Sequence, residues 1–523
     1  MSERTKPEDT QSKADDSVHG EAQKEFVDPV RPAHTHLDRE EIDLLPPEHR
    51  DYLLARHGTL DLDPVPDMSD ADPYNWPHWK KVVNLVLVAF HAMMATFTAA
   101  SIQSAFENIA QDLGCSLQRA SYLTSLQIAI LGGAPLFWKP LSDRYGRRPI
   151  FMISLICSMV CNIGCAYSFS YASMAACRAL VAFFISPAAA IGSAVVAETF
   201  FKRRRARYMG IWTLMVTIGV PVSPFLFGFL AYRVEYRWIY KVLAITNAVQ
   251  FILYVFLGPE TRYLRHGVRH RGSAVKQEYY QFRRIDPTPL RLWDFVQPLR
   301  YAARPCVMIP AAAYAMVFLF GSVMITVEVP QLFGPSFHFN TQQMGLQYIS
   351  MLIGALIGEQ IGGFMSDAWM NRRTKKLGTS PAPEWRLWLS YGGFLLTIVG
   401  VIVFLVQLGE IGTHYNVTPL LGEIGTHYNV TPLVGAAIAS GGTQIVTTVL
   451  ITYSVDCYRE DAASVGVFIT FVRQIWGFIG PFWFPQMFEN VGLYGSAGIT
   501  TGLLVAVSLL PTIYLQWKGR ALR

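Results

Sequence analysis

Charged residues are scarce in this chain. Asp, Glu, Lys and Arg make up 16% of its 523 residues, against about 25% in an ordinary soluble protein. Hydrophobic residues make up 51%, and the mean hydropathy is +0.27. A soluble protein of this length could not cover its surface with so few charges, so the composition excludes a soluble fold. It also excludes a disordered chain, a coiled coil or a secreted disulfide scaffold as a description of the whole.

The motifs of several protein classes are missing as well. The sequence has no nucleotide-binding loop Gly-x-x-x-x-Gly-Lys-[Ser/Thr] and no catalytic triad, so we expect neither an ATP-driven pump nor an enzyme. The seven cysteines show no disulfide framework. Cys157, Cys161 and Cys165 share one face of an apolar helix, but no His or carboxylate joins them. We interpret them as small packing residues and expect no metal and no cofactor.

The formal net charge of +6 is the sum of two unlike regions. Residues 1–79 hold 8 Lys and Arg against 19 Asp and Glu, whereas the rest of the chain holds 36 against 19. Residues 1–79 are polar and contain no apolar run of signal-peptide length, so we predict a disordered acidic cytoplasmic tail with one short helix at 46–57. The basic residues of the second region are scattered between apolar runs, so nucleic acid is not an expected partner.

Twelve apolar runs follow, each about as long as the 20 residues that cross a bilayer as a helix. They are continuous, whereas a membrane barrel would need alternating ten-residue strands. We therefore predict an all-α membrane protein with twelve transmembrane helices. The runs are 82–104, 122–138, 150–168, 172–196, 208–231, 238–257, 306–329, 345–366, 388–407, 433–454, 464–486 and 494–516.

Basic residues in the connections predict the orientation of these spans. With the N-terminus inside the cell, the inner connections hold 25 Lys and Arg. The outer connections hold three, which are Arg119, Arg233 and Arg237. Both termini are therefore predicted to be cytoplasmic.

A long basic connection at 258–305 divides the spans six and six. It separates a predicted six-helix bundle at 80–257 from a second one at 306–523. We expect its basic residues to lie along anionic lipid at the inner face, with a regulatory partner as the alternative.

The inner loop between spans two and three reads Lys-Pro-Leu-Ser-Asp-Arg-Tyr-Gly-Arg-Arg-Pro over residues 139–149. Its aspartate lies where span two meets water, and its glycine permits a tight turn. A carboxylate and a guanidinium at neighbouring helix ends can form a charge-assisted hydrogen bond that latches a gate. The candidate gating residues here are Asp143, Arg144, Gly146, Arg147 and Arg148.

The loop between spans eight and nine repeats the pattern with Asp367 and Arg372, so each half carries one copy. Such internal duplication is typical of secondary transporters. Glu198 and Asp456 occupy similar places at the inner ends of spans four and ten. Each could accept hydrogen bonds from the arginines of the neighbouring loop, or could be solvated at a helix end.

These motifs resemble those of the major facilitator superfamily. Residues 140–148 match its best-known motif, G-x-L-a-D-r-x-G-r-r, and the second copy lies at the equivalent place. The sequences at 72–76 (Asp-Pro-Tyr-Asn-Trp) and 259–263 (Pro-Glu-Thr-Arg-Tyr), together with Arg178, look like those of fungal twelve-span drug:proton antiporters. The resemblance covers about residues 72–523. It implies the facilitator fold of two six-helix bundles and a gate network at the inner loops.

Span five contains Gly219, Pro221, Pro224 and Gly228, and is similar to the antiporter motif g-x-x-x-G-P-x-x-G-G. The prolines remove backbone donors and bend the helix, while the glycines allow a neighbouring helix to approach. Span five is then either a bending element that seals the cavity or an ordinary kinked membrane helix.

Ionisable residues inside the spans mark candidate coupling or substrate sites, because each costs at least about 2.5–3.5 kcal/mol at a helix centre. They are Arg178 in span four, Glu359 in span eight and Arg473 in span eleven. An isolated, desolvated Glu359 could carry a proton or bind a cation. The alternative is a static Glu359–Arg473 pair. Glu328, at the outer end of span seven, is expected to be solvated.

Residues 408–420 are repeated without change at 421–433, which indicates a recent duplication or a gene-model artefact. Each copy carries a glycosylation sequon on the predicted outer side, at Asn416 and Asn429. The proline that follows each sequon disfavours its use.

We therefore expect a monomeric, proton-coupled transporter in the plasma membrane, exporting a drug-like compound or secondary metabolite from a cavity between two rocking bundles. Its partners would be the small-molecule substrate, protons and the lipid bilayer. Two alternatives stay open: uptake of a polyamine or other organic cation, and a receptor that has lost transport.

Overall fold

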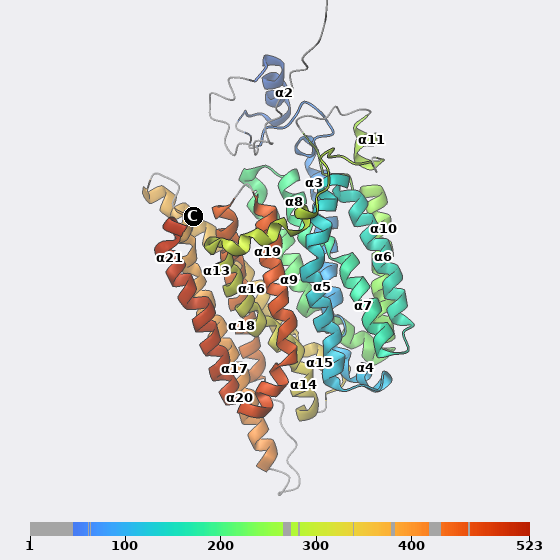
Figure 1. The fold of residues 1–523 in the computed structure, drawn as a ribbon, viewed down its shortest axis with the longest axis vertical. Coiled ribbons are helices and arrows are strands. Elements are labelled where there is room, and N and C mark those ends of the chain that lie inside the picture. The colour runs from blue at the N-terminus through green and yellow to red at the C-terminus, as the bar shows by residue number, and fades with distance from the viewer. Residues whose placement is uncertain are drawn as a thin grey trace, which may run out of the picture.

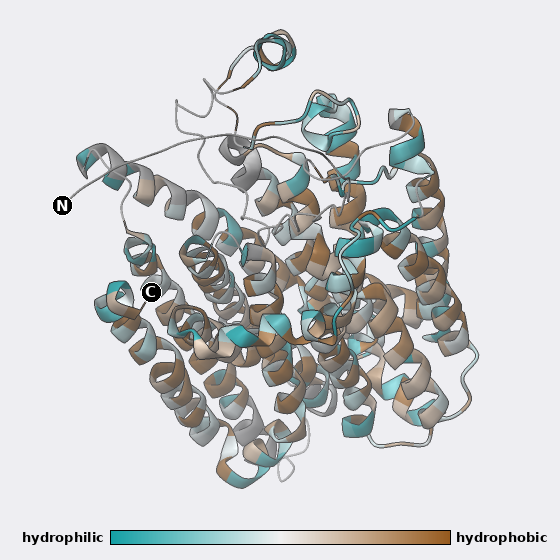
Figure 2. Cartoon of the chain, turned by 45° about the horizontal axis from the view of Figure 1, so that its top comes forward, coloured by the Kyte–Doolittle hydropathy of each residue, from teal (hydrophilic) through white to brown (hydrophobic). Residues whose placement is uncertain are grey.

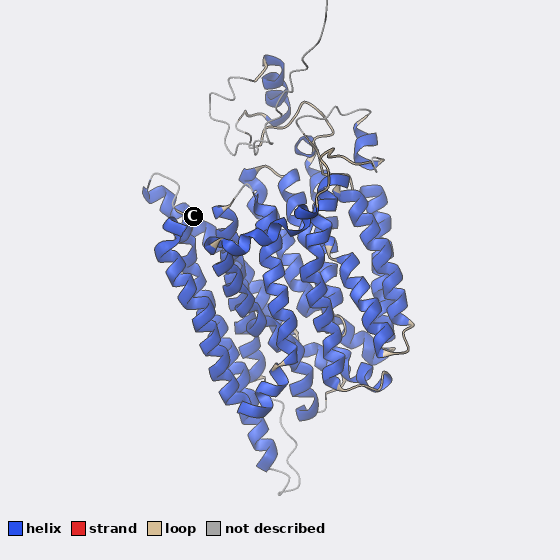
Figure 3. Cartoon of the chain, viewed as in Figure 1, coloured by secondary structure: helices blue, strands red, loops and turns tan. Residues whose placement is uncertain are grey.

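The computed structural model describes residues 45–60, 62, 64–264, 273–280, 283–337, 339–377, 382–417, 430–458 and 461–522. Every regular element in these ranges is a helix (Figure 3). Within them, twelve helical segments are long and apolar enough to cross a membrane, and each overlaps one predicted run. The prediction of an all-helical protein with twelve spans is confirmed.

The first six spans alternate in direction and are joined by short connections (Figure 1). Two of them are interrupted: span one has a short 3-10 turn at Gln103–Ala105, and span four breaks at Ser186 before a proline. Their helices are α3 (His78–Ala100) with α4 (Phe106–Asp112), α5 (Leu117–Tyr145), α6 (Arg147–Ala166), α7 (Tyr171–Ile185) with α8 (Pro187–Thr199), α9 (Lys202–Arg233) and α10 (Arg237–Leu257).

The second six spans follow two short helices of the central connection, α11 (Ala274–Tyr279) and α12 (Leu292–Val296). Spans seven and twelve each contain a π-helical segment, at Leu319–Met324 and Leu504–Leu509. The helices are α13 (Pro305–Phe318) with α14 (Ile325–Phe337), α15 (Thr341–Gln347) with α16 (Ile349–Leu377), α17 (Trp388–Val417), α18 (Thr431–Cys457), α19 (Ala462–Ile479), and α20 (Phe484–Leu503) with α21 (Leu510–Leu522).

The two ends of the bundle differ. Figure 1 shows α2 (Pro47–His57), α11 and the C-terminal residues at one end, which we call the α2 end. The opposite end carries α4 and α15, and we call it the α4 end. The chain therefore has its described N-terminal segment and its C-terminus on the same side of the twelve spans.

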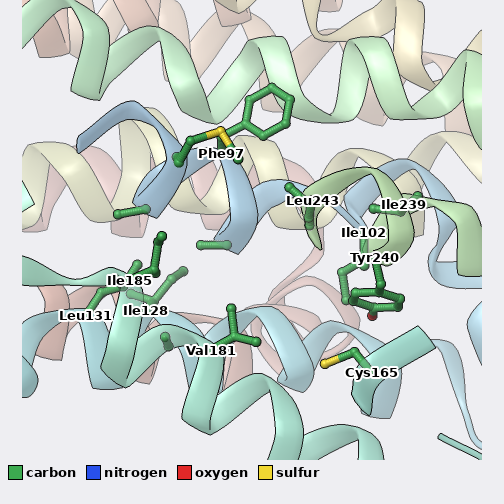
Figure 4. Close-up of a cluster of buried hydrophobic side chains, with 14 of the residues drawn as sticks. Phe97, Ile102, Ile128, Leu131, Cys165, Val181, Ile185, Ile239, Tyr240 and Leu243 are labelled. Carbon is green, nitrogen blue, oxygen red and sulfur yellow. The ribbon is translucent and has the colours of Figure 1, made fainter. Parts of the chain in front are cut away.

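Buried side chains form one large apolar cluster in each half of the chain. The first draws mainly on residues 87–254 and the second on residues 301–515. Figure 4 shows part of the first cluster, in which Ile102 of span one lies beside Tyr240 of span six, and to which Phe97 and Val181 also belong. Around these clusters, apolar side chains such as Phe256 and Leu395 remain exposed, as expected for surfaces that face lipid. Figure 2 shows hydrophobic residues along the helices of the bundle.

Glycines set the close contact between spans eight and ten. Gly354, Gly358 and Gly362 recur every four residues on α16 and face α18. A Cβ on Gly354 would lie 3.0 Å from Ala437 Cα, so the two backbones are nearly in contact. Because lipid does not drive apolar helices together, such small-residue faces are a main source of packing in membranes.

The stretch before span one is ordered over its last residues. Helix α2 forms as predicted, but the expected disorder does not extend through residues 64–79. Asp72 is buried and accepts hydrogen bonds from the backbone N–H groups of Asp67 and Tyr74. Tyr74 in turn donates its hydroxyl to Ala197 O at the end of α8. Residues 1–44 lie outside the described part of the chain.

Candidate functional site

A cavity lies between the two halves in the middle of the bundle. It encloses about 880 Å³ of empty space, including its openings to solvent. Its walls come from spans one, two and five in the first half and from spans seven, eight, ten and eleven in the second. Threonine, serine and glutamine side chains alternate there with apolar ones, which is typical of sites for small organic ligands.

Arg473 of α19 lines this cavity. Its Nη1 donates to the hydroxyl of Tyr314 at 2.7 Å, and its guanidinium lies 4.7 Å from the centre of the Phe318 ring. Its Nε is buried and has no hydrogen-bond partner in the described part of the chain. Arg473 and Glu359 therefore do not form the static pair that the sequence left open as the alternative.

Glu359 of α16 is only 7% exposed and does not itself line the cavity; it lies behind Gln444, which does. Its Oε2 accepts hydrogen bonds from Gln444 Nε2 at 2.5 Å and from Thr448 Oγ1 at 3.2 Å. Gln444 itself lines the cavity. The glycine face of α16 makes this contact possible, because it brings span eight close enough to span ten for short side chains to meet.

Arg178 of α7 is fully buried in the first half. Its guanidinium donates to Gln127 Oε1 at 2.7 Å, to the carbonyls of Leu123 and Ala99 at 3.3 Å and to the hydroxyl of Tyr240 at 3.4 Å. These neutral acceptors tie spans one, two, four and six together around one charge.

Glu328 of α14 differs from the sequence expectation. The expectation that it is solvated is wrong, because it is 1% exposed, and its Oε1 has no hydrogen-bond partner in the described part of the chain. The hydropathy of its neighbours could not show this, since burial here depends on the adjoining helices.

The loop motif forms an ion network at the α2 end. Arg147 lies with its Nη1 2.8 Å from Asp143 Oδ1 and its Nη2 2.9 Å from Glu198 Oε1. Lys139 Nζ contacts the other oxygen of Asp143 at 3.1 Å, and Arg262 Nη1 lies 3.6 Å from Glu198 Oε1. The structure thus brings together Asp143, Arg147 and Glu198 across spans two, three and four.

Glu260 joins this network although sequence reasoning did not select it as a site residue. Its Oε1 accepts from the backbone N–H of Arg147 at 2.8 Å, and its Oε2 accepts from that of Arg148 at 3.0 Å. It thereby caps the N-terminus of α6, where the helix dipole favours a negative charge. Burial raises the pKa of the Glu260 carboxyl, and the backbone donors oppose that rise. The sequence signal that could have identified Glu260 as a site residue is its place in the segment 259–263, which resembles the antiporter family.

The other predicted residues of this loop have distinct positions. Gly146 has a φ of 99°, so it makes the predicted tight turn in a backbone region that favours glycine. Arg148 donates to three backbone carbonyls, those of Gly258, Tyr279 and Val255. Arg144 contacts Asp294 of the central connection at 2.6 Å.

The second copy of the motif is less completely described. Asp367 lies on α16, but its side chain is outside the described part of the structure, and Arg372 is exposed. Asp456 has an arginine nearby, as expected, but it is Arg386, whose Nε lies 3.4 Å from Asp456 Oδ2. Arg386 also donates to Ser366 Oγ at 2.7 Å.

Span five is one helix, α9, with Pro221 and Pro224 inside it. Its glycines face neighbours, as predicted. A Cβ on Gly219 would lie 2.8 Å from Met93 O of span one, and one on Gly228 would lie 2.9 Å from Gly345 Cα of span eight. Pro221 lines the cavity. The Gly228 contact joins the two halves at the α4 end.

The two predicted sequons cannot be placed. Asn416 is in the last turn of α17, but its side chain lies outside the described residues, as does all of Asn429.

A sequence comparison identifies the fold family. The model of the Major Facilitator Superfamily matches residues 85–481. The chain belongs to this superfamily. It is therefore a membrane transporter, and the twelve helical spans agree with that family's fold.

Several fungal transporters are similar to the chain over most of their length. The efflux pump radE of Floropilus chiversii is 26% identical over 87% of this chain and 83% of its own. The probable drug/proton antiporter YHK8 of Saccharomyces cerevisiae is 25% identical over 83% of each chain. The probable efflux pump mfs2 of Aspergillus flavus is 24% identical over 80% of this chain and 97% of its own. The resemblance to fungal drug:proton antiporters is confirmed.

Proposed function

We propose that the chain exports a drug-like compound or secondary metabolite across the plasma membrane in exchange for protons, as a monomer with both termini in the cytoplasm. The cavity between the halves, with an acid one residue behind its wall, is the observation that carries the proposal. The names of the similar fungal proteins, two efflux pumps and a drug/proton antiporter, support the direction of transport.

Two sets of contacts would form the gates. At the α2 end, Asp143, Arg147 and Glu198 would latch spans two, three and four when the cytoplasmic side closes. At the α4 end, Gly228 packs on Gly345, and Thr341 Oγ1 donates to Asn108 Oδ1 at 3.0 Å. Alternate release of these two sets would let residues 80–257 and 306–523 rock about the cavity.

Glu359 would carry the proton. It is buried, and Gln444 links it to the cavity wall, so substrate entry could change its surroundings. A buried carboxylate with only neutral partners is costly in its charged form, which favours exchange of a proton during the cycle.

An efflux assay with a fluorescent substrate tests the coupling. Dissipating the proton gradient should abolish efflux from loaded cells, and efflux that an uncoupler does not change would refute proton coupling. Glu359→Gln should lose gradient-driven export while the protein still reaches the surface. Glu328→Gln is the matched comparison, because Glu328 is also a buried acid. Loss of coupling in that variant alone would assign the proton to span seven.

The two alternatives are less well supported by the site. Cation uptake would call for an acidic group on the cavity wall, and none of the described lining residues is acidic. Unchanged spermidine uptake in Glu359→Gln would exclude Glu359 as its ligand. A receptor without transport is excluded if the purified protein moves a solute into liposomes faster than empty vesicles do.

A further inference from the structure

The charge of the cavity wall limits what the cavity can hold. Among the described residues that line it, Arg473 is the one charged side chain. Glu359 does not line the wall, and its Oε2 is already hydrogen-bonded to Gln444 and Thr448. A ligand in this space therefore meets a positive charge directly and a negative charge only through Gln444.

The two buried arginines differ in how completely the protein satisfies them. Arg178 is fully buried and donates to four acceptors from spans one, two and six. Arg473 donates to one acceptor that the structure shows, the Tyr314 hydroxyl, and its buried Nε has none in the described part of the chain. Because a guanidinium has five N–H donors, Arg473 has donors left for a ligand, whereas Arg178 serves the packing of its own half.

Neutral groups on the same wall also lack partners. The Oε1 atoms of Gln103 and Gln474 are buried without a hydrogen-bond partner in the described part of the chain. Both residues line the cavity, Gln103 from span one and Gln474 from span eleven. Oxygen acceptors of this kind suit hydroxyl donors on a ligand. The rings of Phe318 and Tyr314, which flank the guanidinium, suit a flat apolar body.

We propose that the transported compound is an amphipathic organic acid, whose carboxylate or phenolate binds the guanidinium of Arg473. Its hydroxyl groups would donate to Gln103 and Gln474, and its aromatic part would lie against Phe318. This proposal rests on the proposed function and specifies its substrate class. An anion would accept hydrogen bonds from the guanidinium donors of Arg473 that have no partner in the described part of the chain.

Binding of two dyes with the same ring system tests this proposal. Fluorescein is an anion and rhodamine 6G is a cation, and both can be followed by fluorescence anisotropy with the purified full-length protein in detergent. The intact protein should bind fluorescein more tightly than rhodamine 6G. Arg473→Met should weaken fluorescein binding about tenfold or more, as expected for the loss of a hydrogen bond to a charged group. Arg473→Lys should retain part of it.

Arg119→Met is the matched control, because Arg119 is exposed at the α4 end and is not one of the residues that line the cavity. It should leave fluorescein binding unchanged. A measurement on the unmodified protein covers the case in which Arg473→Met does not fold: salicylate should displace fluorescein, and the neutral salicylamide should not. Equal displacement by both compounds would overturn the proposal. So would tighter binding of rhodamine 6G than of fluorescein, or unchanged fluorescein binding in a folded Arg473→Met protein.

These binding measurements use no proton gradient. Export that resists an uncoupler would therefore refute proton coupling and leave the assignment of Arg473 standing. Conversely, proton-driven efflux of rhodamine 6G by a protein that does not bind fluorescein would support the transport function and refute the organic acid.

Discussion

Gly358 of α16 lies directly against Gly441 of α18. A Cβ on Gly358 would lie 2.8 Å from Gly441 Cα, closer than real side chains approach a neighbouring backbone. The next residue in the chain, Glu359, accepts a hydrogen bond from Gln444, which lies three residues beyond Gly441. The contact between these two glycines therefore holds the buried acid next to the cavity wall.

Gly358→Ala should force spans eight and ten apart. Overpacking of this kind costs about 1–3 kcal/mol, so the variant should unfold at a lower temperature in detergent and export more slowly. Gly363→Ala is the matched control on the same helix, because a Cβ there meets nothing within 4 Å. Equal unfolding temperatures for the two variants would show that the glycine contact does not limit stability.

Glu198→Gln should weaken the latch at the α2 end. It removes the charge that faces Arg147 Nη2 and leaves Asp143 as the closest remaining acid. Arg147 is buried, and removing one charge from a buried ion pair costs up to about 3–5 kcal/mol, so the export rate per surface molecule should fall about tenfold or more. Glu107→Gln, at an exposed acid of the α4 end, is the control. An export rate equal to that of the control would remove Glu198 from the gate.

Glu260→Ala should destabilise the start of span three. It removes the acceptor of the Arg147 and Arg148 backbone N–H groups, and loss of such a cap costs about 0.5–2 kcal/mol. Gly146→Ala should act at the same place, since a Cβ there would lie 2.8 Å from Glu260 Cδ. Thermal unfolding followed by tryptophan fluorescence measures both effects. Gly133→Ala, where a Cβ meets nothing within 4 Å, should leave the transition unchanged.

A disulfide between positions 108 and 341 should lock the α4 end. The side-chain oxygens of Asn108 and Thr341 lie 3.0 Å apart and come from different halves of the chain. Asn108→Cys with Thr341→Cys, made with Cys115→Ser to remove a thiol that lines the same surface pocket, should lose export on oxidation and regain it on reduction. Each single cysteine variant should be insensitive to the oxidant. Undiminished export by the cross-linked protein would mean that this end need not open.

Much of the fold follows from local properties of the sequence. Span length and apolarity are local because each helix satisfies its own backbone in lipid, so all twelve spans could be found without knowing how they pack. The loop motif was equally visible, because Asp143 and Arg147 are four residues apart and meet across the tight turn between α5 and α6. Gly146 could be assigned its turn from the conformational freedom of glycine alone.

Partners between helices were decided by the tertiary structure. The sequence placed Glu359, Arg473 and Glu328 inside or near the membrane. It did not show which face of each helix turns toward which neighbouring helix. Glu359 meets Gln444 rather than Arg473 because the glycine face of α16 brings span ten, and not span eleven, against it. Arg473 is left facing the cavity, and Glu328 is buried without a partner for its Oε1 among the described residues. The sequence states which residues are charged. The partner of each charged side chain depends on helix rotation and packing, which only the assembled bundle determines.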